Sequence, residues 1–403
     1  MWHFALIYIE IDRTQGGGFL LGIYLDNAAT SFPKPEAVTE EVASFLRTSR
    51  GSLSRGTHRA ALRMEEMFLE TRSLLGELFN VDPEHINRIV FTSGATEALN
   101  TAVRGLLQVG DHVITSGLEH NALWRPLKML ERKGIIELTV IPCPGGSGPN
   151  PILVADALRN NTALVAMAHA SNVTGGLLPI PQIGQICREA GIPFLVDVAQ
   201  TAGTHPIDVQ EWNISLLAFT GHKGLLGPQG TGGLYIAPEL ELEPLKYGGT
   251  GTASLHDEMP CWLPDRFEAG TPNGPGIAGL RAAVDFILKT GVENIRCREM
   301  HLTQKLQEGL AQIPGVIVYG PQDPAQKTPI VSWNIQGIDS EEVAFVLDEV
   351  YDIQVRAGLH CAPQTHQSLG TLEQGAVRFS VGYFNTLDDI NAALEAVEEI
   401  ALG

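Results

Sequence analysis

Short apolar runs alternate with amphipathic stretches through the first two thirds of the chain. Apolar runs typical of buried strands lie at 89–91, 112–115, 138–141, 163–168, 194–198 and 216–219, and helical patterns lie at about 94–107, 121–132, 151–159 and 180–190. Strands that alternate with helices of this length indicate βαβ units and a mostly parallel sheet. Right-handed crossovers bring the carboxyl ends of such strands to one edge of the sheet. We therefore look for function in the loops that follow the strands.

The pattern changes after Thr271. Long helical patterns occupy 274–289 and 292–313, strand-like runs occupy 316–319, 330–335 and 353–355, and further helical patterns lie near 340–349 and 387–400. This mixture predicts a smaller α+β domain. We expect an N-terminal extension at 1–22 that is not part of the core, a large domain at 23–270 and a small C-terminal domain at 271–403.

Composition narrows the function classes. The chain has 403 residues, of which 44% are hydrophobic and 18% are charged, as in ordinary folded proteins. Its formal net charge of -19 repels phosphate backbones and anionic membrane surfaces, so we expect neither nucleic acid nor a membrane as partner. The apolar run at 2–9 is too short to span a bilayer and Glu10 follows it at once.

The chain has five cysteines and none of them forms a CxxC pair. An odd number without paired spacing argues against a disulfide framework and against a zinc cluster, and we expect no metal site. A reducing, cytoplasmic location fits this cysteine usage.

Two of the loops after predicted strands combine small, hydroxyl and imidazole side chains. Residues 92–97 (TSGATE) would present free backbone N–H groups at a helix N-terminus, which suits a phosphate, although such residues also cap ordinary helices. His120, which follows Glu119, could stack on a flat ring or move protons, and its alternative is a surface histidine that caps the next helix.

Two other loops carry a buried carboxylate and a buried amine. Asp197 ends a very apolar run, where a carboxylate is costly unless it is paired, and a capping aspartate is the alternative. Lys223 follows another apolar run and lies between Gly221 and Gly224. Desolvation beside that run would favour loss of its proton, and a neutral amine can react with an aldehyde. The interval between Asp197 and Lys223 leaves room for one more helix and strand, which lets both face one pocket. A protonated pyridine nitrogen would pair with the Asp197 carboxylate and keep such a ring an electron sink.

The ordered series of motifs closely resembles the class V aminotransferase-like pyridoxal-phosphate (PLP) enzymes, specifically the cysteine desulfurase and selenocysteine lyase family. The matching segments are 24–30 (YLDNAAT), 93–97 (SGATE), 119–120 (EH), 172–175 (NVTG), 197–200 (DVAQ), 221–223 (GHK), 266–273 (RFEAGTPN) and 356–362 (RAGLHCA). The resemblance runs from Ile23 to the C-terminus. It implies an α/β protein of PLP-transferase fold type I, with a large, mostly parallel sheet domain and a smaller α+β C-terminal domain.

The resemblance also implies roles for individual residues. Lys223 would carry PLP as a Schiff base, Asp197 would pair with the pyridine nitrogen and His120 would stack on the ring and take part in catalysis. The implied cofactor-binding residues are Ala95, Thr96, His120, Asn172, Asp197, Gln200, Thr220, His222, Lys223 and Thr271, and the implied substrate-binding residues are Ala28, Asn172, Arg356 and Arg378. Arg378 would clamp the substrate carboxylate, a task that suits a guanidinium fork. Thr271 matches a residue that relatives contribute across a dimer interface, so we expect a homodimer.

Cys361 lies in a polar loop shortly after Arg356 and next to His360. Nearby positive charge would favour the thiolate, whereas most cysteines are buried and inert. The resemblance implies that Cys361 takes sulfur from L-cysteine as a persulfide and that L-alanine leaves. The other four cysteines have no such surroundings and are expected to be structural.

Three positions depart from the best-known members of the family. Leu359 and Asn121 replace histidines of their motifs, and Ser54 stands where relatives often carry histidine. The departures leave open whether the substrate is L-cysteine or L-selenocysteine. The sulfur acceptor also stays open between an iron–sulfur scaffold, a tRNA-modifying enzyme and a free thiol. A C–S lyase or aminotransferase remains an alternative if Cys361 is not over the ring, and a non-catalytic sulfur-carrier scaffold is the alternative outside enzymes.

Overall fold

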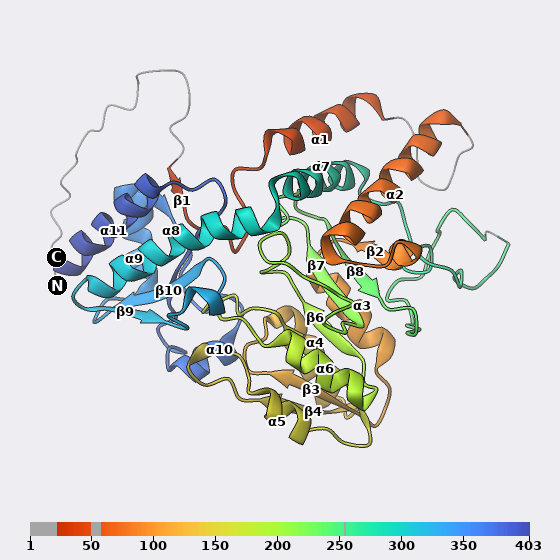
Figure 1. Cartoon of the computed structure of the whole chain (residues 1–403), viewed down its shortest axis with the longest axis horizontal. Helices are drawn as coiled ribbons and strands as arrows, with labels where there is room; N and C mark the ends of the chain where they lie inside the picture. Colours follow the sequence, from red (N-terminus) through yellow and green to blue (C-terminus); the bar gives the residue numbers. More distant parts are fainter. Residues whose placement is uncertain (1–21, 50–57, 254) are drawn as a thin grey trace.

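A seven-stranded sheet forms the centre of the computed structural model, which describes residues 22–49, 58–253 and 255–403 (Figure 1). Its strands follow the order β2-β8-β7-β6-β5-β3-β4. They are β2 (Ile89–Thr92), β3 (Asp111–Ser116), β4 (Ile136–Ile141), β5 (Thr162–Ala168), β6 (Phe194–Asp197), β7 (Leu216–Thr220) and β8 (Gly232–Ile236). Within the described residues, β8 alone runs against the others, because it pairs antiparallel with both β2 and β7. The predicted α/β class with a large, mostly parallel sheet is therefore confirmed.

Helices cover both faces of this sheet. They are α1 (Glu36–Thr48), α2 (Arg59–Phe79), α3 (Ala95–Leu106), α4 (Asn121–Arg132), α5 (Pro151–Asp156), α6 (Ile180–Ala190) and α7 (Gly274–Thr290), with short 3-10 turns at Pro83–Arg88 and Pro144–Gly146. Apolar residues of α3 and α4 pack on one face, and those of α2, α6 and α7 pack on the other. Because both faces are covered, strands such as β6 are apolar without alternation, and Phe194, Leu195 and Val196 are fully buried.

A smaller, three-stranded antiparallel sheet follows in the order β12-β10-β9. The part of the chain that forms and covers this sheet consists of α8 (Val292–Gln312), β9 (Val316–Tyr319), a 3-10 turn at Pro324–Gln326, β10 (Ile330–Ile335), α9 (Ser340–Tyr351), β11 (Ile353–Gln354), α10 (Pro363–Leu369), β12 (Val377–Ser380) and α11 (Leu387–Leu402). α8, α9 and α11 supply the apolar side chains that bury this sheet. β1 (Ile23–Tyr24) pairs in parallel with β11, so the first described strand belongs to this part of the molecule.

The two cores do not divide the chain at a single point. α7 lies beyond the expected division at 270 and 271, yet it packs against α1 and α2, and its Leu280 and Ile287 belong to the core of the large sheet. Leu25 lies before that division and belongs to the core of the small sheet. The numerical boundaries 23–270 and 271–403 stay a prediction. Of the expected extension at 1–22, residues 1–21 lie outside the described residues, as does Ser54.

Most predicted strands and helices lie within a few residues of their observed bounds. Strands β1, β8 and β12 and helices α1, α2 and α10 were not predicted. β8 shows why: its sequence, GGLYI, begins with two glycines, and both sit against the neighbouring strands, where an added Cβ at Gly233 would meet the ring of Phe219. A strand whose glycines allow neighbouring backbones to approach closely lacks the β-branched pattern by which strands are recognised.

The carboxyl ends of β3, β5, β6 and β7 meet at one edge because these strands are parallel. The loops that follow them carry the residues singled out from the sequence. Among the described residues, no helix is both long and apolar enough to cross a membrane, and no group of three or more His, Cys, Asp or Glu could hold a metal ion.

A buried ion pair fastens the segment around Glu268 to the edge strand of the large sheet. Arg72 Nη2 lies 2.5 Å from Glu268 Oε1, which also accepts the backbone N–H of Phe91 at 2.7 Å. We predict that Glu268→Gln lowers the free energy of unfolding by about 3 kcal/mol, because it leaves a buried guanidinium without its counter-charge. Denaturant unfolding measures this. Glu137→Gln, in the exposed pair with Arg159, is the control and should cost less than about 1 kcal/mol; equal effects of the two substitutions would contradict the account.

Candidate active site

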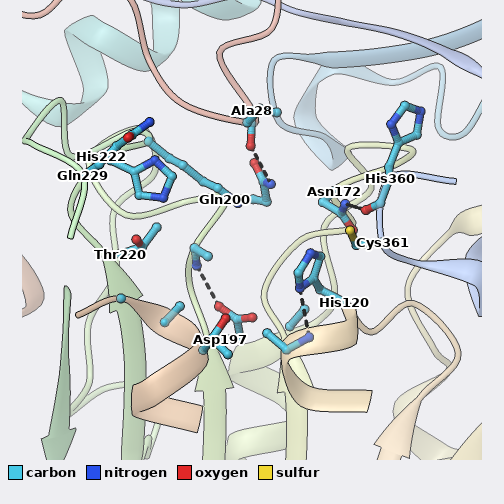
Figure 2. Close-up of a pocket in the computed structure, with 18 of the residues that line it drawn as sticks. Ala28, His120, Asn172, Asp197, Gln200, Thr220, His222, Gln229, His360 and Cys361 are labelled. Atoms are coloured by element: carbon cyan, nitrogen blue, oxygen red, sulfur yellow. Dashed lines mark hydrogen bonds between the residues drawn. The ribbon is translucent and has the colours of Figure 1, made fainter. Parts of the chain in front are cut away.

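A cavity of about 420 Å³ opens at the carboxyl edge of the large sheet. It is lined by loops from both parts of the molecule: those after β2, β3, β5, β6 and β7, and the segments that carry residues 28–29, 356–361 and 378. Figure 2 shows Asp197 on the floor, His222 and Thr220 on one side, and His120, Asn172 and Cys361 on the other. All site residues predicted from the sequence line this cavity except Thr271.

Asp197 ends β6 on the cavity floor with only 6% of its surface exposed. Its Oδ1 accepts the backbone N–H of Ala199 at 2.9 Å. Burial raises the pKa of this carboxyl, against the effects of the Ala199 hydrogen bond and of Lys223. No cation forms an ion pair with Asp197 among the described residues, so a cation held over the floor would be stabilised by it.

Lys223 lies in the loop after β7 and reaches into the same cavity. Burial lowers the pKa of its amine to about 8, opposed by the charge of Asp197 and supported by those of Arg378 and Arg356. The amine therefore has a sizeable neutral fraction near physiological pH. A neutral amine beside a buried carboxylate can add to a carbonyl group and can accept a proton.

The N-terminus of α3 provides the side of the cavity next to Lys223. Gly94 precedes the helix without any side-chain cap, and Ala95 and Thr96 begin it. The first N–H groups of a helix have no partner within the helix, so they favour an anion. Thr220 and His222 face this end, and His222 Nδ1 is buried without a hydrogen-bond partner in the described structure.

His120 caps α4 and has its ring in the cavity. Its Nδ1 accepts the backbone N–H of Ala122 at 3.0 Å, which assigns the proton of the neutral ring to Nε2. Burial, together with the charges of Lys223, Arg356 and Arg378, lowers the pKa of His120 to about 4. The ring is therefore neutral at pH 7, and the Nε2–H group is its free donor.

Arg378 is held by two groups from the large sheet and the N-terminal segment. Its Nη2 donates to Asp26 Oδ1 at 2.7 Å, and its Nη1 donates to the backbone oxygen of Asn172 at 3.0 Å. The residue is 1% exposed and its Nε has no partner within the described structure. Arg356 lines the cavity beside it, and the two residues form a backbone bridge. Two guanidinium groups on one wall, one with an unused Nε–H, suit a bound carboxylate.

The segment that carries Cys361 is fastened to the large sheet by two backbone oxygens. Asn172 Nδ2 donates to the carbonyl of His360 at 2.6 Å, and the backbone N–H of Asn121 donates to the carbonyl of Cys361 at 2.8 Å. His360 and Cys361 both have positive φ, 48° and 58°, a conformation that side chains other than glycine seldom adopt. The fastening therefore holds a turn that presents the Cys361 side chain to the cavity, with the thiol exposed.

Two buried histidines support this turn from behind. His360 Nε2 lies 3.0 Å from the backbone oxygen of Ala376, and His366 Nδ1 lies 2.8 Å from Thr371 Oγ1. The centres of the two rings are 5.6 Å apart. Burial lowers the pKa of His366 to about 4 and that of His360 to about 2, so both rings are neutral. They act as packed, hydrogen-bonded parts of the turn.

A second buried carboxyl lies behind the floor. Glu119 is fully buried, accepts a hydrogen bond from Ser116 Oγ at 2.5 Å and accepts the backbone N–H of Ala168 at 2.9 Å. Burial raises its pKa to about 8 in spite of these bonds, and the charge of Asp197 raises it as well. Glu119 is therefore largely protonated at pH 7.

The unpaired groups fit a flat, anionic, pyridine-type cofactor. A buried carboxylate lies below, a helix N-terminus with free N–H groups lies at one side, and a nucleophilic amine reaches in between. The Asn172 Oδ1, His222 Nδ1 and Arg378 Nε atoms are buried and have no partner among the described residues. Such groups are costly unless a ligand satisfies them.

Several lining residues were not expected from the sequence. Gln229 and Gly230 lie just before β8 and carry no motif, and His360 was named only as the neighbour of Cys361. Thr271 lies instead in an adjoining cavity of about 210 Å³, together with Glu97, Gly230 and Lys246. The expectation that Thr271 reaches a cofactor site in a second copy of the chain stays a prediction.

Comparison with known proteins gives a consistent assignment. The model of the Aminotransferase class-V family matches residues 23–393. A probable cysteine desulfurase of Methanothermobacter thermautotrophicus is 34% identical over 385 residues, which are 94% of each chain. The cysteine desulfurase of Salmonella agona is 34% identical over 389 residues, which are 94% of this chain and 93% of the relative.

Solved structures agree with this assignment. The apo cysteine desulfurase from Thermococcus onnurineus NA1 superposes with a TM-score of 0.89 at 33% identity, and the cysteine desulfurase CsdA from Escherichia coli with a TM-score of 0.84 at 30% identity. In both cases 95% of each chain is covered. The chain therefore belongs to the aminotransferase class-V family, in which these relatives are cysteine desulfurases.

Proposed function

We propose that this protein is a PLP-dependent cysteine desulfurase that converts L-cysteine to L-alanine and keeps the sulfur on Cys361 as a persulfide. The observation that carries the proposal is the meeting of Lys223, Asp197 and Cys361 in one cavity that also holds two arginines. The names of the relatives, which match along almost the whole chain, support it. A thiol that faces the cavity favours sulfur transfer over a lyase or aminotransferase, which needs no such thiol.

PLP would be held by the groups that the cavity leaves unpaired. Asp197 would pair with the ring nitrogen, His120 would pack on the ring, and Asn172 and Gln200 would lie near the ring hydroxyl. The residues proposed for the phosphate are Ala95, Thr96, Thr220 and His222, with Thr271 from a second copy of the chain. When bound, PLP supplies an aldehyde for the Lys223 amine and a cationic ring that withdraws electrons from the substrate.

Lys223 Nζ has two tasks in this proposal. As a neutral amine it attaches the cofactor, and once the substrate amine has replaced it, the free Nζ removes the proton from the substrate Cα. Both tasks require the unprotonated amine, which burial and the two arginines favour. The charge of Asp197 opposes this because it raises the pKa of Lys223, and pairing of that carboxylate with the bound ring would weaken the opposition.

The substrate carboxylate would bind to Arg378 and Arg356, beside Ala28 and Asn172. Asp26 and the Asn172 carbonyl already orient the Arg378 guanidinium, so little side-chain freedom is lost on binding. An anion at this wall also reduces the positive potential at His120, because Arg356 and Arg378 are among the charges that lower its pKa. His120 would then hold a proton more readily, although protonation of Nδ1 requires release of the Ala122 N–H.

The sulfur step balances without an outside oxidant. The Cys361 sulfur attacks the substrate sulfur, a sulfur–sulfur bond forms, and the substrate carbon–sulfur bond breaks. The electron pair of that bond stays with the three-carbon fragment, which takes up protons and leaves as alanine. The thiol must sit close to the substrate, and the hydrogen bonds from Asn172 and Asn121 to its turn favour this position.

We further propose a homodimer with shared sites and a reducing, cytoplasmic location. All five cysteines are free, and Cys361 must stay reduced between turnovers. The cavity that contains Thr271 adjoins the main cavity at Glu97 and Gly230, so a second copy could complete the site from there.

We predict that Cys361→Ala lowers alanine formation from L-cysteine by on the order of a hundredfold or more, because the nucleophile for sulfur is lost. The cofactor absorbance should persist, since the variant does not touch Lys223 or Asp197. Alanine is quantified in single-turnover and steady-state assays. Cys297→Ala, at another exposed cysteine, is the control and should behave like wild type. Undiminished alanine formation by Cys361→Ala would disprove the role of this thiol.

The reactivity of Lys223 should rise with pH through about 8, the pKa to which burial lowers its amine. The Asp197 carboxylate raises that pKa, so Asp197→Asn should move the midpoint to lower pH. The measurement is the labelling of Lys223 by trinitrobenzenesulfonate in cofactor-free protein, followed by peptide mass spectrometry. Asp388→Asn, at the remote start of α11, should leave the midpoint in place. A midpoint that moves upward in Asp197→Asn would contradict the proposed pairing.

For Arg378→Lys we expect KM for L-cysteine to increase on the order of tenfold or more, with a smaller change in kcat, because an ammonium replaces a paired fork. Arg356→Lys should have the smaller effect, since no hydrogen bond to another described residue orients that side chain. Steady-state kinetics on both variants decide the order. A larger effect at Arg356 would move the carboxylate clamp to that residue.

A further inference from the structure

A groove of about 580 Å³ runs along the outer face of α4, next to the turn that carries Cys361. It is separate from the cavity described above. Its lining residues are Asn121, Trp124, Arg125, Lys128, Met129, Arg132, Lys133 and Pro363. Half of them are cationic and none is acidic.

The cations of this groove are mostly unpaired, which is unusual in a chain with a formal net charge of -19. Arg125, Arg132 and Lys133 are exposed and form no ion pair with any described residue. Lys128 alone is paired, with Glu131, and its amine lies 5.6 Å from the ring centre of Trp124. The groove is therefore a local positive patch with an aromatic side chain in it.

The groove is joined directly to the reactive turn. Asn121, at one end of the groove, donates its backbone N–H to the Cys361 carbonyl at 2.8 Å. Pro363, which also lines the groove, lies two residues beyond Cys361. The charge of Arg125 lowers the pKa of His120, so the patch lies within electrostatic range of the cavity. A molecule in the groove would have one end beside the turn that carries Cys361.

The spacing of the lining residues indicates how long a bound molecule would be. Asn121, Arg125, Lys128 and Arg132 follow at intervals of three and four residues, so they share one face of the helix. A helix of 12 residues extends about 18 Å. A single small thiol would cover only a fraction of this length, whereas a short peptide segment matches it.

We propose that the sulfur acceptor is a protein that lays an acidic segment with an apolar side chain into this groove and so brings its own thiol to Cys361. This inference rests on the desulfurase function proposed above. Carboxylates would face the arginines and lysines, and the apolar side chain would contact Trp124, Met129 and Pro363. In the transfer, the acceptor thiolate attacks the outer sulfur of the Cys361 persulfide, the sulfur–sulfur bond breaks, and Cys361 leaves as a thiolate while the acceptor carries the persulfide.

Charge and apolar surface together favour a protein over RNA. A nucleic acid would bring many phosphates into the negative field of the whole chain, whereas an acidic segment needs only a few carboxylates at the patch. The apolar part of the groove suits a side chain such as leucine, which a phosphate backbone lacks. Electrostatic pairing of this kind acts mainly on the association rate and weakens with salt.

The experiment measures how fast Cys361 reacts with short peptides that carry one cysteine as a thionitrobenzoate disulfide. Three peptides of equal length contain one leucine and four glutamates, four glutamines or four lysines. The protein is full-length and carries Cys261→Ser and Cys297→Ser, so that Cys361 is the reacting exposed thiol among the described cysteines. We expect the glutamate peptide to react about tenfold faster than the glutamine peptide at low salt, and this ratio to approach one at high salt. Equal rates, or a faster lysine peptide, would overturn the proposal.

Charge reversal tests the groove itself. Arg132→Glu with Lys133→Glu should bring the ratio of glutamate to glutamine rates close to one, and the milder Arg132→Gln with Lys133→Gln should give an intermediate ratio. Arg47→Glu in α1 with Lys305→Glu in α8 changes the net charge equally at exposed sites away from α4 and should keep the wild-type ratio. If the control double variant lowers the ratio as much as the groove double variant does, the preference depends on net charge alone and the proposal is contradicted. Polyuridine RNA that competes with the glutamate peptide at equal charge concentration would assign the groove to nucleic acid instead.

The exchange reaction requires neither cofactor nor L-cysteine. A protein that forms no alanine but shows the charge preference would refute the desulfurase function and retain the docking groove. A protein that forms alanine and a persulfide without any charge preference would refute the groove alone.

Discussion

Asn172 contacts the turn that carries Cys361 through its side chain and contacts Arg378 through its backbone oxygen. It lies in the loop after β5 of the large sheet, whereas both partners belong to the C-terminal part of the chain. These two hydrogen bonds hold together the wall on which the thiol and the arginines lie. Without them the floor, with Asp197 and Lys223, would still form on the large sheet alone. The site is therefore a shared product of two cores, and its geometry depends on their contact at Asn172.

The charges in the cavity explain why an anionic cofactor and an anionic substrate suit it. Lys223, Arg356 and Arg378 line it together, and each is placed so that it lowers the pKa of His120. The buried carboxylate of Asp197 is set against this excess of cations, while Glu119 behind it is kept largely protonated. A bound phosphate and a bound carboxylate would each supply ion pairs and hydrogen bonds in place of the hydration that these buried groups have lost. Asp26 and the Asn172 carbonyl hold the Arg378 guanidinium before binding, which lowers the entropic cost of ordering it.

Local sequence patterns predicted the floor of the site well and its walls less well. The apolar runs at 194–198 and 216–219 end at Asp197 and shortly before Lys223, so parallel strands alone bring the two loops together. The family motifs added Arg378, Asn172 and Cys361, which lie far apart in the chain. The pairing of Arg378 with Asp26, and of Asn172 with the His360 carbonyl, could not be predicted, because each joins residues that lie far apart in the sequence and carry no shared local pattern. Gln229 lines the cavity although no motif marks it. Thr271 lies outside the cavity of its own chain, so it could reach such a site only in a second copy of the chain.

The central claim is that sulfur from the substrate passes to Cys361. The most direct test is to incubate the PLP-loaded protein with L-cysteine that carries a heavy sulfur isotope, alkylate all thiols, and map the label by peptide mass spectrometry. We expect one labelled sulfur atom on the peptide that contains Cys361, in an amount equal to the alanine formed in the first turnover. Alanine formed in that amount with the label only in free sulfide, or on another cysteine, would contradict the account.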